Sequence, residues 1–219
     1  MCQGSYTMSK RLIAFGCSIT YGQGLPDCNT TFLTPSNYAW PSLVAKNINC
    51  TCNNQARPGS SNREILWRIL NYNEYHHSDI VVILWTIKDR GSIITGKNFW
   101  DTIQLHIQEW SGQPKEVQIW RKFKVKTYNQ YDTQLETLHY IDYAHRVLKE
   151  KVKTVLHYVS DDDLLIHTEP YIEAKLLGNG KKYMLRYPYA ADGGHPGEEG
   201  HRAFADKINK DLNKELTCA

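Results

Sequence analysis

The sequence predicts an α/β protein in which a parallel sheet lies between two layers of helices. Three of the four predicted strands are continuous apolar runs, as expected for strands that helices cover on both faces. Segments with helical spacing of apolar residues separate these runs, so strand and helix alternate through most of the 219 residues. Right-handed crossovers between parallel strands place the loops that follow them at one edge of the sheet.

The predicted strands are short and end at polar or glycine-rich turns. They cover residues 11–16, about 48–53, 80–85 and 163–167. The run at 80–85 reads IVVILW and contains no charged side chain, which is typical of a central strand. The first run, RLIAFG, ends at a glycine that precedes a serine.

Helical patterns fill the intervals between the strands. They cover about 38–47, 61–73, 133–157 and about 197–214. Ser36 and Asn37 open the first of these helices, and Pro196 precedes the last. The last helix carries apolar side chains at helical spacing from Phe204 to Leu212, which indicates one buried face.

Two stretches break this alternation within what we predict to be a single domain, residues 1–219. The stretch 87–132 holds Trp100, Trp110 and Trp120, and we expect an insertion near the strand-end edge. Aromatic side chains are mostly core by default, but a minority of these could form a platform for sugar rings. The second insertion, 169–190, contains Gly178-Asn179-Gly180 between apolar runs, which predicts a small hairpin.

Composition narrows the classes of function. With 26 basic and 23 acidic residues the net charge is only +3, and no block of Lys and Arg indicates a nucleic-acid partner. The first residues lack an apolar core after a basic start, so we expect no secretory signal, no membrane anchor and a cytoplasmic location. The six cysteines have no C-x-x-C spacing, which favours free thiols and neither a metal nor another cofactor.

Small and polar residues follow the predicted strands and should meet at one edge of the sheet, where open parallel sheets bind ligands. The first strand leads into Gly16-Cys17-Ser18-Ile19-Thr20, and the second leads into NQARPGSSN at 54–62. The third leads into WTIKDR at 85–90. The segment ADGGHPGEEGH at 191–201 stands just before the last helix.

Ser18, His195 and Asp192 form a candidate proton relay. A serine hydroxyl is a poor nucleophile until a base removes its proton, and an imidazole is a better base when a carboxylate fixes its tautomer. Asp192 and His195 are three residues apart, with Gly193 and Gly194 between them to permit a tight turn. Attack also creates an oxyanion that needs preorganised donors. The N–H groups of Ser18 and Gly59 are our candidates for these donors.

These blocks resemble those of the SGNH (GDSL-type) hydrolases, a family of esterases and deacylases. Gly16-Cys17-Ser18-Ile19-Thr20 is similar to the nucleophile block, with Cys17 in place of the usual Asp. Pro58-Gly59-Ser60-Ser61-Asn62 is similar to the block whose glycine donates to the oxyanion, and Asp192-x-x-His195-Pro196 to the last block. The resemblance spans nearly the whole chain. It implies a flavodoxin-like three-layer α/β/α sandwich and a Ser18-His195-Asp192 triad.

The remaining block departs from the family pattern. The family has Gly-x-Asn-Asp after the third strand, and the Asn completes the oxyanion hole, but this chain has no Asn in WTIKDR. The third donor is then Thr86, Arg90 or Asn62, although Asn62 is also placed to cap the helix that follows it. Compact members from tailed bacteriophages are similar here, which would place the protein in the host cytoplasm or the virion.

We therefore expect a serine esterase that removes an acyl group, most simply acetyl, from a carbohydrate or another small ester. Two alternatives stay open. One is a lipase-like or thioesterase hydrolase, and the other is a non-catalytic glycan-binding or virion-associated protein that retains the fold. The sequence does not predict the oligomeric state.

Overall fold

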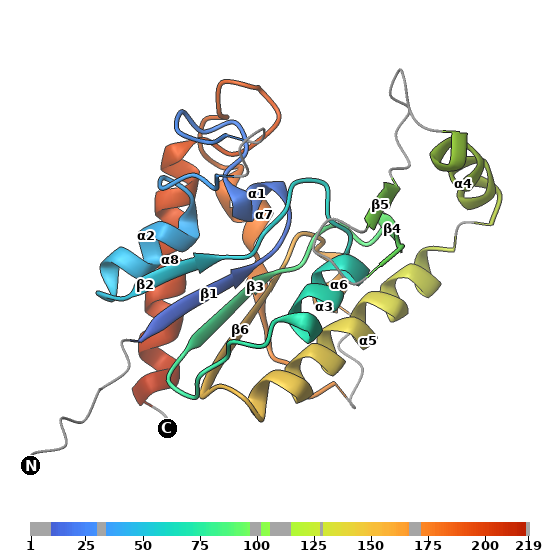
Figure 1. Ribbon diagram of the computed structural model, residues 1–219. Coiled ribbons are helices and arrows are strands. Elements are labelled where there is room, and N and C mark those ends of the chain that lie inside the picture. The colour runs from blue at the N-terminus through green and yellow to red at the C-terminus, as the bar shows by residue number, and fades with distance from the viewer. Residues whose placement is uncertain are drawn as a thin grey trace, which may run out of the picture.

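A computed structural model describes residues 10–29, 34–96, 102–105, 115–127, 129–166 and 172–217. Its centre is a parallel five-stranded sheet with the order β2-β1-β3-β6-β7 (Figure 1). The strands are β1 (Arg11–Phe15), β2 (Thr51–Asn54), β3 (Ile80–Leu84), β6 (Thr154–Val159) and β7 (Leu176–Asn179). Helices flank this sheet on both faces, which confirms the predicted fold class.

Four long helices form the two outer layers. Helices α2 (Trp40–Asn47) and α8 (Glu198–Thr217) cover one face of the sheet. Helices α3 (Asn62–Asn71) and α5 (Gln130–Lys149) cover the other (Figure 1). The predicted helices at 38–47, 61–73 and 197–214 are confirmed apart from their end residues.

Successive side chains of each strand point to opposite faces of the sheet, so each face has its own hydrophobic core. Leu12 and Ala14 of β1 pack toward α2 and α8, whereas Ile13 and Phe15 pack toward α3 and α5. All four side chains have no exposed surface. A strand that is buried on both faces reads as a continuous apolar run, which is why β1 and β3 are evident in the sequence.

The strand order places a crevice at the carboxyl ends of β1 and β3. The chain runs from β1 to β2 on one side and then returns to β3 on the other side of β1. Crossovers that leave in opposite directions open a gap between the loops that follow the two strands. Ser18 follows β1 and Thr86 follows β3, so the sheet topology brings both residues to this gap.

The predicted strand at 163–167 is wrong, and so is the end of the predicted helix at 133–157. Residues Asp163–Ile166 form the short helix α6, while the fourth strand is β6, which begins five residues after α5 ends at Lys149. Leu148, Val152 and Val155 keep helical spacing across this break, and no Gly or Pro marks it. The β-branched and aromatic run TVLHYV is buried between β3 and β7 instead.

The predicted hairpin around Gly178-Asn179-Gly180 is also wrong. Leu176–Asn179 is β7, which pairs parallel to β6, and the short helix α7 (Gly180–Met184) follows directly. Gly180 is required by packing, because a Cβ there would lie 2.5 Å from Cζ of Phe204. This glycine therefore indicates a close approach to α8 rather than a hairpin turn.

The described part of the predicted insertion at 87–132 contains a small antiparallel pair and a helix. Strands β4 (Gly91–Ile94) and β5 (Thr102–Leu105) pair with each other, and α4 (Lys115–Thr127) follows them. In Figure 1 these elements lie beyond the main sheet, where β4 contacts α3 and α4 contacts β5. Trp100 and Trp110 lie outside the described residues.

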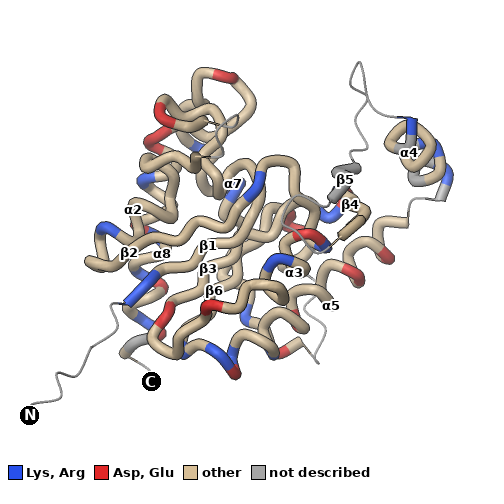
Figure 2. The backbone as a smooth tube through the Cα atoms, viewed as in Figure 1, with Lys and Arg blue, Asp and Glu red and all other residues tan. Residues whose placement is uncertain are grey.

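Charged residues are distributed over the described elements. Figure 2 shows basic and acidic positions interspersed along the backbone. Many of them pair with each other, such as Arg11 with Asp79 at 2.8 Å and Lys207 with Asp211 at 2.7 Å. Within the described ranges, no helix combines the length and the hydropathy that a membrane span requires.

Candidate active site

The nucleophile candidate lies in a tight turn between β1 and the one-turn helix α1 (Ser18–Tyr21). A Cβ at Gly16 would lie 2.0 Å from Thr20 Oγ1 and 3.1 Å from the Leu84 carbonyl oxygen, so only glycine fits there. Ser18 is the first residue of α1, where backbone N–H groups lack partners within the helix. Its side chain is almost buried, and solvent reaches it through a small pocket.

Asp192 and His195 form a directly hydrogen-bonded pair. Asp192 Oδ2 lies 2.6 Å from His195 Nδ1, and Asp192 Oδ1 accepts hydrogen bonds from the N–H groups of Gly194 and His195, both at 3.0 Å. Gly193 adopts a φ of +66°, which favours glycine and lets the loop turn back on itself. The loop thus holds the carboxylate against one imidazole nitrogen, as the sequence spacing predicts.

The surroundings of Asp192 favour its ionised form. Partial burial would raise the pKa of this carboxyl, but the hydrogen bonds from Gly194 and His195 outweigh burial and lower it. Gly24 lies directly against this carboxylate, and a Cβ at this position would lie 2.6 Å from Asp192 Oδ2. Gly24 also has a φ of +88°, so two independent constraints require glycine.

Ser18 and His195 line the same pocket, which has a volume of about 60 Å³. The other side chains around it come from the ends of β1, β3, β6 and β7 and from the loop before α8. The lining residues are Cys17, Ser18, Ile19, Thr86, Ile87, Arg90, Ser160, Lys181, Gly194 and His195. The Ser18 hydroxyl points to Cys17 Sγ at 4.0 Å, rather than to the imidazole.

Cys17 caps the start of α1 and is buried beside the nucleophile. Burial would raise the pKa of its thiol, but the positive charge of Arg90 and a hydrogen bond from Thr86 lower it below the usual value. Cys17 therefore lies in an electropositive part of the site that Arg90 creates.

The glycine loop after β2 is held in place by a buried arginine. Gly59 has a φ of +79°, and Ser60 N–H bonds back to the Arg57 carbonyl at 3.3 Å. Arg68 of α3 donates to Ser60 Oγ at 2.7 Å and to the Gly16 carbonyl at 3.2 Å. The same side chain thus connects the nucleophile turn with the Gly59 turn, although Gly59 itself does not line the 60 Å³ pocket.

Of the three candidates for a third donor, Thr86 and Arg90 line the pocket and Asn62 does not. The Asn62 amide accepts from Thr86 N–H at 2.8 Å and donates to the Thr86 carbonyl at 3.0 Å. It thereby fixes the turn after β3. The cap of α3 is Ser61, which accepts from Glu64 N–H at 3.2 Å, so the capping role that we predicted for Asn62 is wrong.

Sequence reasoning missed Arg68, Ser160 and Lys181. Ser160 donates to the Trp85 carbonyl at 2.7 Å and follows β6, which the helical pattern concealed. Lys181 follows β7, where we predicted a hairpin. One signal could have revealed Arg68: it is a lone arginine on the apolar side of a predicted helix, close to Ile65 and Ile69. All three side chains are buried.

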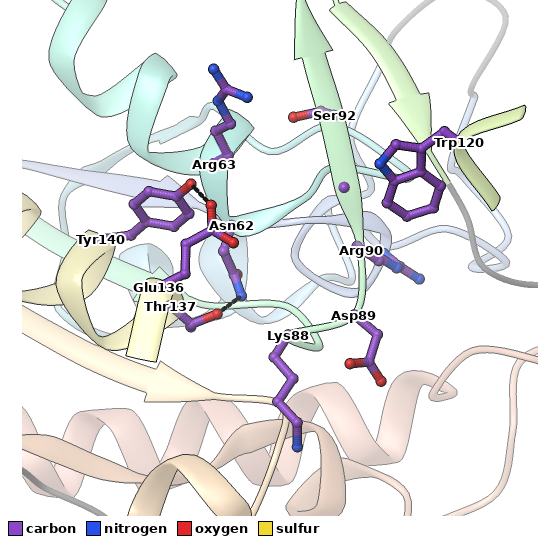
Figure 3. A pocket seen from close by; sticks show the side chains of 11 residues that line it. Asn62, Arg63, Lys88, Asp89, Arg90, Ser92, Trp120, Glu136, Thr137 and Tyr140 are labelled. Atoms are coloured by element: carbon purple, nitrogen blue, oxygen red, sulfur yellow. Dashed lines mark hydrogen bonds between the residues drawn. The ribbon is translucent and has the colours of Figure 1, made fainter. Parts of the chain in front are cut away.

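A second pocket, of about 210 Å³, adjoins the first and shares Arg90 with it. Figure 3 shows Trp120 of α4 at its side, and the ring packs so closely that a Cβ on Gly91 would lie 2.6 Å from it. Glu136 and Tyr140, one turn apart on α5, line the opposite side, where Glu136 accepts a hydrogen bond from the Tyr140 hydroxyl. Across the residues described, no group of three His, Cys, Asp or Glu side chains is arranged to hold a metal ion.

Neither a protein-family model nor a curated protein matches this sequence. Solved structures with a similar fold include an acetyl xylan esterase from the rumen bacterium Butyrivibrio proteoclasticus, with 12% identity and a TM-score of 0.55. This chain aligns over 95% of its own length but spans only 65% of that esterase. A phospholipase A1 from Streptomyces albidoflavus has 12% identity and a TM-score of 0.52, with 94% of this chain and 99% of the phospholipase aligned.

A second carbohydrate esterase, described as having divergent catalytic and non-catalytic binding functions, has 12% identity and a TM-score of 0.55. The alignment covers 94% of this chain and 65% of that esterase. The chain therefore has the fold of the SGNH hydrolases, and its structural neighbours are SGNH and GDSL-type hydrolases that act on esters. At 12% identity these three neighbours establish the fold alone.

Proposed function

We propose that this protein is a serine esterase in which Ser18 attacks an acyl carbonyl, His195 transfers the proton and Asp192 orients His195. The observation that carries the proposal is the bonded Asp192–His195 pair opening on the same small pocket as Ser18. Two segments separated by most of the chain supply these side chains, Ser18 from one and Asp192 and His195 from the other. Each lies in the strand-end loop or pre-helix loop that the chemistry requires.

The proposed reaction has two steps. Ser18 Oγ turns from Cys17 Sγ toward the imidazole, loses its proton to His195 Nε2 and attacks the carbonyl carbon. The tetrahedral oxyanion receives hydrogen bonds from the N–H groups of Ser18 and Gly59, and its collapse expels the alcohol with the proton from His195. Water then hydrolyses the acyl-enzyme by the same relay in reverse roles. Catalytic hydrogen bonds that are long in the free enzyme commonly shorten when substrate binds.

Pocket size supports a short acyl group such as acetyl. A cavity of about 150 Å³ holds benzene in another protein. The volume here is about 60 Å³, which accommodates only a few heavy atoms. The larger neighbouring pocket beside Trp120 offers an aromatic face for the alcohol part of the ester, and sugar rings pack well on such faces. We therefore propose an acetylated carbohydrate as the substrate class.

Two observations fit functions other than an acetylesterase. A phospholipase A1 shares the fold, which fits a lipase-like or thioesterase activity, but long acyl chains exceed the 60 Å³ pocket. The Ser18 hydroxyl points to Cys17 Sγ, which fits a glycan-binding protein that keeps the fold without turnover. Acyl chain length and turnover therefore distinguish the three hypotheses.

The test is hydrolysis of 4-nitrophenyl acetate and of an acetylated xylo-oligosaccharide by the wild type, Ser18→Ala and Ser42→Ala. Ser42 is a half-buried serine on α2, away from the pocket, and serves as the matched control. We expect the wild type and Ser42→Ala to release acetate and Ser18→Ala to lose nearly all activity. Equal release by all three proteins would refute the esterase. Rates that rise from acetate to octanoate esters would favour the lipase-like alternative.

A further inference from the structure

Attack on an ester needs strong donors at the oxyanion, and the loop after β3 lacks the asparagine that SGNH hydrolases use there. Three side chains near this loop carry donors: Asn62, Thr86 and Arg90. The best-placed of these side chains is one that lines the pocket that holds Ser18 and has an N–H or O–H that no protein acceptor already uses. The hydrogen bonds of the site decide among the three.

The amide hydrogens of Asn62 and the backbone N–H of Thr86 are already bonded within the protein. Asn62 Nδ2 donates to the Thr86 carbonyl at 3.0 Å and to Thr137 Oγ1 at 3.4 Å, which occupies both amide hydrogens. The Thr86 N–H donates to Asn62 Oδ1 at 2.8 Å. The Thr86 hydroxyl acts on the Cys17 thiol and lowers its pKa, and it has a single hydrogen and no charge to offer an oxyanion.

Arg90 differs from both. It lines the pocket together with Ser18 and His195, and its Nη1 is buried without a hydrogen-bond partner in the described part of the chain. Figure 3 shows its side chain pointing away from Glu136, one of the two acidic side chains that line the second pocket. A buried N–H without an acceptor costs free energy in the empty site, and an acceptor that arrives during the reaction recovers it.

We propose that Arg90 Nη1 is the third oxyanion donor of this protein, in place of the missing asparagine; the proposal rests on the esterase function above. When Ser18 Oγ bonds to the carbonyl carbon, the carbonyl π electrons move to oxygen, and the guanidinium donates to that oxygen. When the tetrahedral adduct collapses, the electrons return, the bond to the alcohol oxygen breaks and His195 supplies the leaving proton. Arg90 donates hydrogen bonds only, and His195 carries out the proton transfers.

The same geometry explains why Cys17 stands where the family pattern has aspartate. Cys17 and Arg90 line the same pocket, and the charge of Arg90 acts directly on the Cys17 thiol. A carboxylate at position 17 would pair with the guanidinium and occupy its free hydrogens. A neutral residue at position 17 leaves them available. The two departures from the family pattern are therefore one coupled change.

The test compares kcat for acetate release by the wild type, Arg90→Ala, Cys17→Asp and Cys17→Asn. We expect Arg90→Ala to lower kcat by about 100- to 1,000-fold with a small change in KM, the usual loss for one oxyanion donor. Cys17→Asp should fall by at least about tenfold relative to Cys17→Asn, which has the same shape without the charge. Arg146→Ala, an exposed arginine on α5, is the charge control and should keep its activity.

Chemical rescue separates donation from a structural role. Added guanidinium at millimolar concentration should restore part of kcat in Arg90→Ala and none in Ser18→Ala. If the wild type is active and Ser18→Ala is not, but Arg90→Ala retains full kcat, the Arg90 assignment is overturned while the esterase stands. If the wild type releases no acetate, the esterase itself fails. If Arg90→Ala does not fold by circular dichroism, the comparison of Cys17→Asp with Cys17→Asn decides alone, and equal kcat values overturn the assignment.

Discussion

Replacing Arg68 with Met removes the side chain that joins the nucleophile turn to the Gly59 turn. Arg68 donates to the Gly16 carbonyl at 3.2 Å, to Ser60 Oγ at 2.7 Å and to the Gln55 carbonyl at 3.1 Å. Burial lowers its pKa to about 10, against the opposing charge of Glu64, so Arg68 still carries its proton at pH 7. The variant therefore leaves three acceptors without their donor, whereas Glu64 keeps its ion pair with Arg57 at 3.3 Å.

These losses set the expected magnitude. A hydrogen bond from a charged donor contributes about 1.5–3 kcal/mol, and the variant removes three of them. The terms overlap and Met recovers some apolar burial, so we expect a net loss of about 3–5 kcal/mol in the free energy of unfolding. With a slope of about 2 kcal/mol/M, the urea midpoint should fall by about 2 M. We also expect kcat for acetate release to fall, because both loops lose their anchor.

Urea titration followed by circular dichroism measures the first effect, and the esterase assay measures the second. Arg63→Met is the matched control on the exposed side of the same helix and should shift stability by less than about 0.5 kcal/mol. A change below about 1 kcal/mol in Arg68→Met, with unchanged kcat, would refute this reasoning.

Three further predictions concern the relay and the buried histidines. Asp192→Asn keeps the shape of the carboxylate but not its charge, so kcat should fall by about 10⁴-fold, and a loss below tenfold would contradict its role. Gly24→Ala should lower kcat, because its Cβ would lie 2.6 Å from Asp192 Oδ2, whereas Gly178→Ala, which also has a positive φ but meets only Lys207 Cε at 4.0 Å, should not. Burial lowers the pKa of His157 and His201 from 6.5 to about 3, so both fold neutral. The contribution of these neutral histidines to the free energy of unfolding should be complete above pH 6.5 and should decrease toward pH 3. At pH 5 the loss should be about 2 kcal/mol per histidine. A urea midpoint that is constant between pH 7 and pH 5 would contradict this.

The sequence predicts most of the fold because β1 and β3 are buried on both faces and helices separate the strands. It fails between Lys149 and Ile166, where helical spacing continues through a strand without a breaker residue. Only the pairing of Thr154–Val159 with β3 determines that this segment is extended. Such pairing is a tertiary effect that local periodicity does not contain.

The candidate site is predicted in part for a similar reason. Asp192 and His195 are close in sequence, so their spacing alone predicts the hydrogen bond that the structure contains. The role of Arg68 depends on contacts with residues 8 and 52 positions away, which no local pattern reveals. The choice among Asn62, Thr86 and Arg90 likewise depends on which donors are already bonded. Which donors are already bonded is determined by the three-dimensional structure and not by any local sequence pattern.

Labelling with a fluorophosphonate tests the central claim, that Ser18 is a nucleophile activated by His195. The reagent forms a covalent bond only with an activated serine, and peptide mass spectrometry locates the adduct. We predict one adduct on the peptide that contains Ser18 in the wild type, none in Ser18→Ala, and labelling slowed by about 100-fold or more in His195→Ala. An adduct at another residue, or equal labelling rates in the wild type and His195→Ala, would contradict the account.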